Sequence, residues 1–247
     1  MDGADPAYLA AKRTVDDRVR DRLLAELPDA PRILEAGCGT GVTVPRLLDW
    51  GVAAGSYRGV DRDPTLVERA RERRAAELDA DRTATGFRVG DLTATFERGD
   101  ALEAFGDEAA DLVVAQAFLD LVSIPEALDA FAAALGPDGL MYAPITFDGG
   151  TVFQPDHPAD EAVVAAYHGA IDDVAGRDAR AGRHLLDRCR ERGGDLLAAG
   201  ASDWIVHPRN GDYPADERQF LGTILEFVAA ANHRARSSLS PPRPNSV

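Results

Sequence analysis

Apolar positions near the start of the chain follow two different periods. Over residues 6–27 they recur at helical spacing, as at Val15, Val19 and Leu23, and this spacing predicts a long helix with one apolar stripe that ends before Pro28. Residues 32–36 are a short apolar run that stops at a group of glycines, and a second helical stretch follows. The order predicts a strand, a glycine loop and a helix.

The same alternation continues along the chain. We expect strands at 57–60, 93–96, 112–115 and 140–147, a hairpin partner for the third strand at 87–89, and a sixth strand at 203–207. We expect helices after Asp63, over 125–135 with Gly136 and a turn at 137–139 after it, and over 214–231. Strands that alternate with helices predict an α/β fold with a doubly wound, mainly parallel sheet and helices on both faces.

Charge narrows the choice of partner. The 247 residues carry 42 acidic and 27 basic side chains, a formal net charge of −15, and Lys12 is the only lysine. Such a negative surface repels phosphate backbones and anionic lipids. The charge therefore argues against nucleic acids and membranes as partners and favours a small molecule. The bias fits an acidic protein of a high-salt cytoplasm, and GC-rich codon usage is the open alternative.

Length and cysteine content exclude further classes. A chain of this length can bury a hydrophobic core without disulfide bonds, and we expect one large domain. Cys38 and Cys189 are too few and too far apart for a disulfide framework or a metal site. No apolar run reaches the ~20 residues that span a bilayer, and no signal peptide is recognisable. We therefore expect a cytoplasmic protein with reduced thiols and no bound metal.

The predicted strand ends carry the residues that can bind a ligand. Gly37, Gly39 and Gly41 follow the first strand, and Val42 stands where a dinucleotide fingerprint has its third glycine, so the spacing fits NAD poorly. Asp61 ends the second strand and suits the two hydroxyls of a ribose, and Asp100 ends the third and suits an exocyclic amine such as that of adenine. Together these ends predict an adenosine without a pyrophosphate.

Several of these segments together resemble class I, Rossmann-like S-adenosylmethionine-dependent methyltransferases. The similarity lies in residues 33–41, 59–61, 99–101 and 111–115, with 135–140 resembling the turn into the fifth strand. It covers roughly residues 30–147. The resemblance implies methyl transfer from S-adenosylmethionine, with the cofactor held by Glu35, Gly37, Gly39, Gly41, Asp61, Arg62, Asp100, Ala101 and Gln116.

The acceptor is less determined. Residues 116–120 lack the Asn/Asp-Pro-Pro-aromatic run of amino-methylating enzymes that act on nucleic acids, so O-, N- or S-methylation of a small molecule remains. Contacts to the acceptor or to the cofactor carboxylate are expected from Tyr8, Lys12, Arg13, Asp120 and Phe147. His157, His168 and His184 are the candidate proton acceptors, and surface positions are the alternative for each. Arg177, Arg180 and Arg183 form a basic cluster that suits an acidic acceptor, or else a solvated loop.

The resemblance also suggests a division of the chain. We expect an N-terminal helix over 1–28 that covers the cofactor and acceptor, a cofactor-binding core over 30–147, an acceptor lid with helices and a strand over 148–234, and a disordered Ser/Pro tail over 235–247. The family's seventh strand is not recognisable, and Pro144 interrupts the fifth strand. We therefore expect a sheet that lacks its seventh strand.

Other functions remain open at this point. A protein of the same fold could bind S-adenosylmethionine or S-adenosylhomocysteine without turnover. A transferase could instead use the decarboxylated cofactor, although the acidic acceptor motif of such enzymes is missing after the fourth strand. Reduction with NAD is disfavoured by the spacing of the glycine loop.

Overall fold

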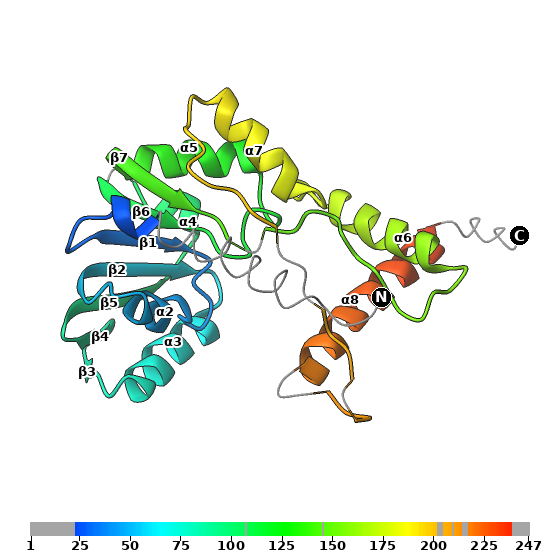
Figure 1. The fold of residues 1–247 in the computed structure, drawn as a ribbon, viewed down its shortest axis with the longest axis horizontal. Helices are drawn as coiled ribbons and strands as arrows, with labels where there is room; N and C mark the ends of the chain where they lie inside the picture. The colour runs from blue at the N-terminus through cyan, green and yellow to red at the C-terminus, as the bar shows by residue number, and fades with distance from the viewer. Residues whose placement is uncertain are drawn as a thin grey trace, which may run out of the picture.

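The protein is built around one seven-stranded sheet with the order β3-β4-β5-β2-β1-β6-β7 (Figure 1). The computed structural model describes residues 23–106, 108–144, 146–201, 205–208, 210–213 and 217–238. The strands are β1 (Arg32–Ala36), β2 (Ala54–Asp61), β3 (Asp81–Arg82), β4 (Gly86–Val89), β5 (Asp91–Arg98), β6 (Ala110–Val114) and β7 (Leu135–Tyr142). The helices are α2 (Thr43–Asp49), α3 (Pro64–Glu77), α4 (Ala101–Ala104), α5 (Ile124–Ala134), α6 (Asp160–Asp172), α7 (Ala181–Glu191) and α8 (Glu217–Ser238).

Five neighbouring strands run parallel, and a hairpin extends one edge. β5, β2, β1, β6 and β7 are parallel to one another, whereas β4 is antiparallel to β5 and β3 to β4. β1 lies inside the sheet, and Ile33, Leu34 and Ala36 are buried because both faces are covered. The predicted doubly wound, mainly parallel α/β fold and the predicted hairpin partner at 87–89 are confirmed.

Two apolar layers cover the two faces of the sheet. Ile33 and Leu34 are adjacent on β1 and point to opposite faces, as strand geometry requires. Ile33 packs in a cluster that includes residues of α2 and α3, and Leu34 packs with residues of α4, α5 and α7. The two helix layers lie on either side of the sheet in Figure 1. This core holds the strand ends in fixed positions.

α6 and α8 lie beside each other and extend away from the sheet (Figure 1). The side-chain amide of Asn232 on α8 donates to the carbonyl of Val163 on α6 at 3.2 Å. Val228 and Ala231 are buried on α8, while none of the residues of α6 is fully buried. The segment expected to form an acceptor lid therefore contains a helix pair built outside the sheet core.

The end of α5 and the last strand differ from the prediction. Gly136 does not end the helix, because β7 begins directly at Leu135. The predicted turn at 137–139 is instead an irregularity inside β7: from the pair Ala110–Leu135 to the pair Leu112–Leu140, β6 advances two residues and β7 five. Such a bulge leaves extra residues unpaired within one strand. The strand also ends at Tyr142 and not at Phe147, so Pro144 lies beyond it.

The expectation of a sheet with fewer than seven strands is wrong, since the sheet has seven strands. The hairpin of β3 and β4 brings the number to seven. The fifth predicted strand, β7, is an edge strand, and among the described residues its pairing partner is β6. The predicted strand at 203–207 is also wrong where it is described, because Ile205–His207 are not in a strand. α8 extends to Ser238, so residues 235–238 of the expected tail are helical, and the remainder of that tail lies outside the described residues.

The first predicted helix is described only near its end. Residues 23–26 are helical, and Leu23 is buried in the core cluster with α2. The remainder of the expected helix, residues 6–22, lies outside the part of the chain that the structure describes. Within the described residues, none of the helices combines the length and the apolar character needed to cross a bilayer.

Candidate functional site

The glycine loop between β1 and α2 is tied to the end of β2. The backbone N–H groups of Gly37 and Cys38 both donate to the carbonyl of Val60, at 2.9 and 3.1 Å. Gly37, Gly39 and Gly41 have φ values of 68°, 52° and 69°, which side chains rarely adopt. A Cβ atom would clash with Phe118 at Gly37 and with Phe96 at Gly41, whereas at Gly39 it would meet nothing within 4 Å. The loop therefore presents an open backbone surface at Gly39.

Asp61 joins this loop to the next turn. Its Oδ2 atom accepts the backbone N–H of Gly39 at 2.9 Å, and its Oδ1 atom accepts the N–H of Asp63 at 2.9 Å. A carboxylate has about four acceptor positions, so each oxygen retains capacity for a further donor. The carboxylate is fixed beside the open loop, an arrangement that fits two neighbouring hydroxyl groups of a sugar.

Glu35 lies beneath the glycine loop, where it is 2% exposed. Its carboxylate accepts hydrogen bonds from the Tyr57 hydroxyl and, at 2.7 Å, from the Thr43 hydroxyl. Burial raises the pKa of Glu35 to about 7, and the two hydroxyl donors act in the opposite direction. Cys38 is buried nearby, and burial raises the pKa of its thiol. Both Glu35 oxygens are engaged inside the protein, so the residue supports the loop from below.

Asp100 stands next to Asp61 at the same edge of the sheet. The N–H of Gly99 donates to the backbone carbonyl of Asp61 at 2.9 Å. Asp100 caps α4, since its Oδ1 atom accepts the N–H of Leu102 at 3.0 Å, and its Oδ2 atom forms an ion pair with Arg62. Ala101, the first residue of α4, is buried. The third predicted strand end therefore adjoins the second.

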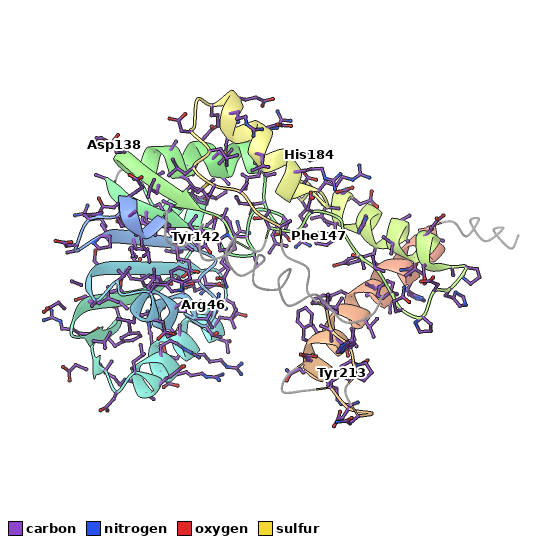
Figure 2. All side chains as sticks on the ribbon, in the orientation of Figure 1. Arg46, Asp138, Tyr142, Phe147, His184 and Tyr213 are labelled. Carbon is purple, nitrogen blue, oxygen red and sulfur yellow. The ribbon has the colours of Figure 1, made fainter. Side chains whose placement is uncertain are left out.

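Gln116 connects the fourth strand end to α2. Its Oε1 atom accepts a hydrogen bond from Arg46 at 2.8 Å, and the preceding residue, Ala115, donates its N–H to the carbonyl of Tyr142. Figure 2 shows Arg46 and Tyr142 in the part of the sheet domain that faces α6 and α8. The four strand ends predicted to bind the cofactor are thus neighbours along one edge.

The loop after β6 contacts the glycine loop and also carries an acidic residue. Phe118 packs against Gly37, where a Cβ atom would lie only 2.8 Å from its ring. Two residues later is Asp120, whose Oδ1 atom is buried and has no hydrogen-bond partner among the described residues. Burial raises the pKa of Asp120, while backbone hydrogen bonds and the charge of Arg177 lower it. A buried acceptor atom without a donor is costly, and Asp120 is therefore a strong candidate for contact with a ligand.

An aromatic cluster adjoins Asp120, and Figure 2 shows its member Phe147 between the sheet and α6. The ring of Phe147 lies 6.3 Å from that of Tyr167 and 5.7 Å from that of His168, between centroids. Burial, and then the charge of Asp120, raises the pKa of Tyr167. Burial lowers the pKa of His168, whose Nε2 atom has no partner in the described part of the chain. Asp120, Phe147 and His168 are thus gathered in one region.

The other two histidines predicted to take up a proton are not part of this aromatic cluster. His157 accepts the N–H of Ala159 at its Nδ1 atom, in the turn before α6. His184 is on α7, with its Nδ1 atom 2.5 Å from Asp178. Of the three predicted histidines, only His168 belongs to the aromatic cluster. Tyr8, Lys12 and Arg13 lie outside the residues that the structure describes.

Several residues that shape the candidate site were not predicted from the sequence. Tyr57 and Thr43 hold Glu35, Arg46 holds Gln116, and Phe118 and Tyr167 form the side nearest Asp120. A buried tyrosine normally needs a hydrogen-bond partner, so Tyr57 inside a predicted strand could have indicated a buried acceptor. Nothing in the sequence marks Phe118 or Tyr167, because their contacts join segments far apart in the chain.

Comparison with known families gives a match over most of the sheet domain. Residues 8–145 match the family model described as "Methyltransferase domain". The chain is 39% identical over 92 residues to the probable ribosomal RNA small subunit methyltransferase A of Natronomonas pharaonis, a match that covers 36% of the chain and 28% of that relative. It is 37% identical over 95 residues to the magnesium-protoporphyrin O-methyltransferase of Rhodobacter capsulatus, covering 36% of the chain and 40% of the relative.

The matched part thus spans less than half the length of either curated relative. Among solved structures, the [4+2]-cyclase SpnF is 20% identical, with 88% of this chain and 68% of that chain covered and a TM-score of 0.50. This likeness concerns the fold.

Proposed function

The chain belongs to the class I S-adenosylmethionine-dependent methyltransferases, and on that premise we propose that it transfers a methyl group from S-adenosylmethionine to a small-molecule acceptor. The observation that carries the proposal is the direct bond between Gly39 N and Asp61 Oδ2. It fixes a carboxylate beside the one glycine of the loop that has open space above it. A nucleoside needs both features, because its sugar hydroxyls require acceptors and its body requires close approach to the backbone.

The strand ends supply the remaining contacts of the cofactor. Asp61 would hold the ribose hydroxyls, and Asp100, with Arg62 and Ala101 beside it, would adjoin the adenine. The rings of Phe118 and Phe96 fill the space beside Gly37 and Gly41, so these two glycines shape the loop, and Gly39 would approach the ligand. Glu35 acts indirectly, since its carboxylate is buried and bonded to Tyr57 and Thr43.

When bound, S-adenosylmethionine supplies a methyl group on a positively charged sulfonium. The contribution of the chain is to place the acceptor atom in line with that group, an effect that can supply ~7–11 kcal/mol when reactants are well oriented. The rigid sheet edge and the loop after β6 suit this role, because Phe118 contacts Gly37 while Asp120 lies two residues away. Asp120 and His168 are the groups that would take up a proton if the acceptor arrives protonated.

A small acceptor is favoured by charge. The net charge of −15 opposes the approach of a polyanion such as RNA. The two curated relatives are named for acceptors of different kinds, ribosomal RNA and a protoporphyrin, so their names do not select an acceptor for this chain.

Cofactor binding can be tested by calorimetric titration with S-adenosylhomocysteine. Asp61→Asn should weaken binding about 100-fold, because charge-assisted bonds to two hydroxyls lose roughly 2.7 kcal/mol together. The matched control is Asp91→Asn, which makes the same change at the start of β5, the opposite end of the sheet, and should bind as the wild type does. Equal affinity of the Asp61 variant and the wild type for S-adenosylhomocysteine would contradict the proposal.

Turnover needs a separate measurement, since a protein that binds the cofactor without turnover would pass the first test. The wild type should transfer label from methyl-labelled S-adenosylmethionine to a small molecule in an extract of the source organism. Binding of S-adenosylhomocysteine without any transfer of label would instead support the non-enzymatic alternative.

A further inference from the structure

A cavity of about 200 Å³ lies between α7, the start of α5 and the loop that precedes α7. Its walls include two arginines, Arg177 and Arg188, together with His184 and one acidic side chain, Asp178. In a chain with 15 more acidic than basic residues, two guanidinium groups against one carboxylate make this lining locally basic. The sequence cluster of Arg177, Arg180 and Arg183 thus contributes only Arg177 to it.

The basic groups of the cavity are incompletely neutralised. Within the described part of the chain, Arg177 makes neither an ion pair nor a side-chain hydrogen bond. Arg188 pairs with Glu191 at 2.8 Å, with both side chains at least half exposed, and such pairs are weak. Asp178 is directed to His184, at 2.5 Å. The Arg177 guanidinium therefore has no direct ion-pair partner in the described part of the chain, and that of Arg188 has only an exposed one. Guanidinium groups suit phosphate and carboxylate geometry.

The backbone at the cavity wall is compatible with a negative group. Ser123, Ile124 and Pro125 begin α5 there, and the Ser123 side chain makes no capping bond. The start of an α-helix favours negative charge, although Glu126 in the same turn offsets part of this effect. The cationic side chains are the main determinant, and the helix start adds to them.

The wall of the cavity adjoins the loop that carries Asp120. The backbone N–H of Asp178 donates to the carbonyl of Asp120 at 3.4 Å, and Arg177 acts electrostatically on the Asp120 carboxylate. Asp120 belongs to the loop whose Phe118 packs on Gly37. Arg177 is therefore near the side of the candidate site on which we place the acceptor.

We propose that this cavity binds an anionic group, a phosphate or a carboxylate, carried by the methyl acceptor. That the anion belongs to the methyl acceptor rests on the proposed methyl transfer, whereas the anion site itself does not depend on it. The acceptor is then an anionic small molecule with its negative group held by Arg177 and Arg188, at a distance from the atom that is methylated.

The first test uses inorganic phosphate and acetate as probes, titrated at low ionic strength into the full chain saturated with S-adenosylhomocysteine. We expect at least one of the two anions to bind, and the anion that binds more tightly indicates whether the acceptor carries a phosphate or a carboxylate. Arg177→Gln should weaken that binding about tenfold, and the double variant Arg177→Gln with Arg188→Gln should weaken it further. Arg190→Gln, on the same helix but paired with Asp187 and outside the cavity, should change it less than twofold.

Three results would overturn the anion site. They are binding of neither probe, equal binding by the wild type and the Arg177 variant, and binding of a probe only to the chain without S-adenosylhomocysteine, because the probe would then occupy the place of the cofactor's own carboxylate. Failure of the wild type to bind S-adenosylhomocysteine would count against the proposed function alone, since the probes can still be titrated without it.

The second test concerns the acceptor. Small molecules from an extract of the source organism are separated by anion exchange into an anionic and a non-anionic fraction, and each is incubated with enzyme and methyl-labelled S-adenosylmethionine. Label should enter the anionic fraction and fall about tenfold with Arg177→Gln. Label in the non-anionic fraction alone would refute the anionic acceptor and leave the methyltransferase activity established.

Discussion

At the scale of single residues, the glycine loop allows backbone strain to be separated from ligand contact. Gly39 and Gly106 both have positive φ, 52° and 54°, and a Cβ atom on either would meet nothing within 4 Å. Alanine at each should therefore destabilise the fold by a similar ~1–2 kcal/mol. Gly39→Ala should also reduce affinity for S-adenosylhomocysteine at least tenfold, because its methyl group would occupy the space proposed for the ligand.

Gly106→Ala is the control for strain, since it lies after α4 and outside the candidate site. Urea unfolding and calorimetric titration of both variants would decide the matter. Similar affinities for the two would show that the surface at Gly39 does not contact the cofactor.

Glu35 should make stability depend on pH. Its pKa is raised to about 7 by burial, from an ordinary value of 4.5. The folded state therefore binds this proton more tightly than the unfolded state does. The resulting stabilisation is fully present below pH 4.5 and is lost as the pH rises to about 7, with a total loss of about 3 kcal/mol. Glu35→Gln should remove this loss, so its stability relative to the wild type should rise between about pH 5 and about pH 8.

Urea unfolding of the wild type and the Glu35→Gln variant at about pH 5 and about pH 8 measures this difference in stability. Glu72→Gln, an exposed change on α3, should shift stability by less than about 0.5 kcal/mol at either pH. A Glu35 variant with the same pH dependence as the wild type would contradict the assignment of the buried proton.

At the scale of secondary-structure elements, Arg58 joins β2, β5 and the segment around α4. Its guanidinium pairs with Glu97 at 3.0 Å, contacts Glu108, and donates to the Ala104 carbonyl at 3.2 Å. The side chain is only 23% exposed, so Arg58→Met would leave partly buried acceptors without a donor. We expect a loss of roughly 2 kcal/mol in urea unfolding.

Arg190→Met is the matched control, since Arg190 pairs with Asp187 on the surface of α7 with both side chains more than half exposed. It should change stability by less than about 0.5 kcal/mol. If the two variants lost the same stability, the Arg58 contacts would have no special role in joining these elements.

Most elements of the sheet domain followed from local patterns, and the exceptions have local causes. The cap at Asp63 and the following Pro64 start α3 as predicted, with Asp63 accepting the N–H of Thr65 at 2.7 Å. Gly136 was expected to end α5, since glycine commonly follows a helix. In the structure it begins the irregular part of β7, because pairing with β6 continues on both sides of the 136–139 segment. That pairing depends on a distant strand and leaves no local signal.

At the scale of the whole molecule, the net charge of −15 should make stability depend on salt. Like charges repel in the compact state, and the screening length falls from about 10 Å at 0.1 M salt to about 3 Å at 1 M. We expect the Tm to rise by several degrees between about 0.1 M and about 1 M KCl. This is also the behaviour that a high-salt cytoplasm would favour.

Sorbitol at matched osmolality provides the comparison, because it changes the solvent without screening charge. A Tm that stays constant or falls in KCl would show that self-repulsion contributes little to stability.

The sequence by itself determined the alternation of strands and helices, the glycine loop, and the positions of Asp61 and Asp100 at strand ends. These features depend on period, on the conformational freedom of glycine and on the common edge formed by parallel strand ends. Only the tertiary structure decided that Glu35 is buried against Tyr57 and Thr43, that Asp120 lies near Phe147 and Tyr167, and that Arg177 and Arg188 line one cavity. Burial and contacts between distant segments arise when the chain packs in three dimensions, so no short stretch of sequence contains them.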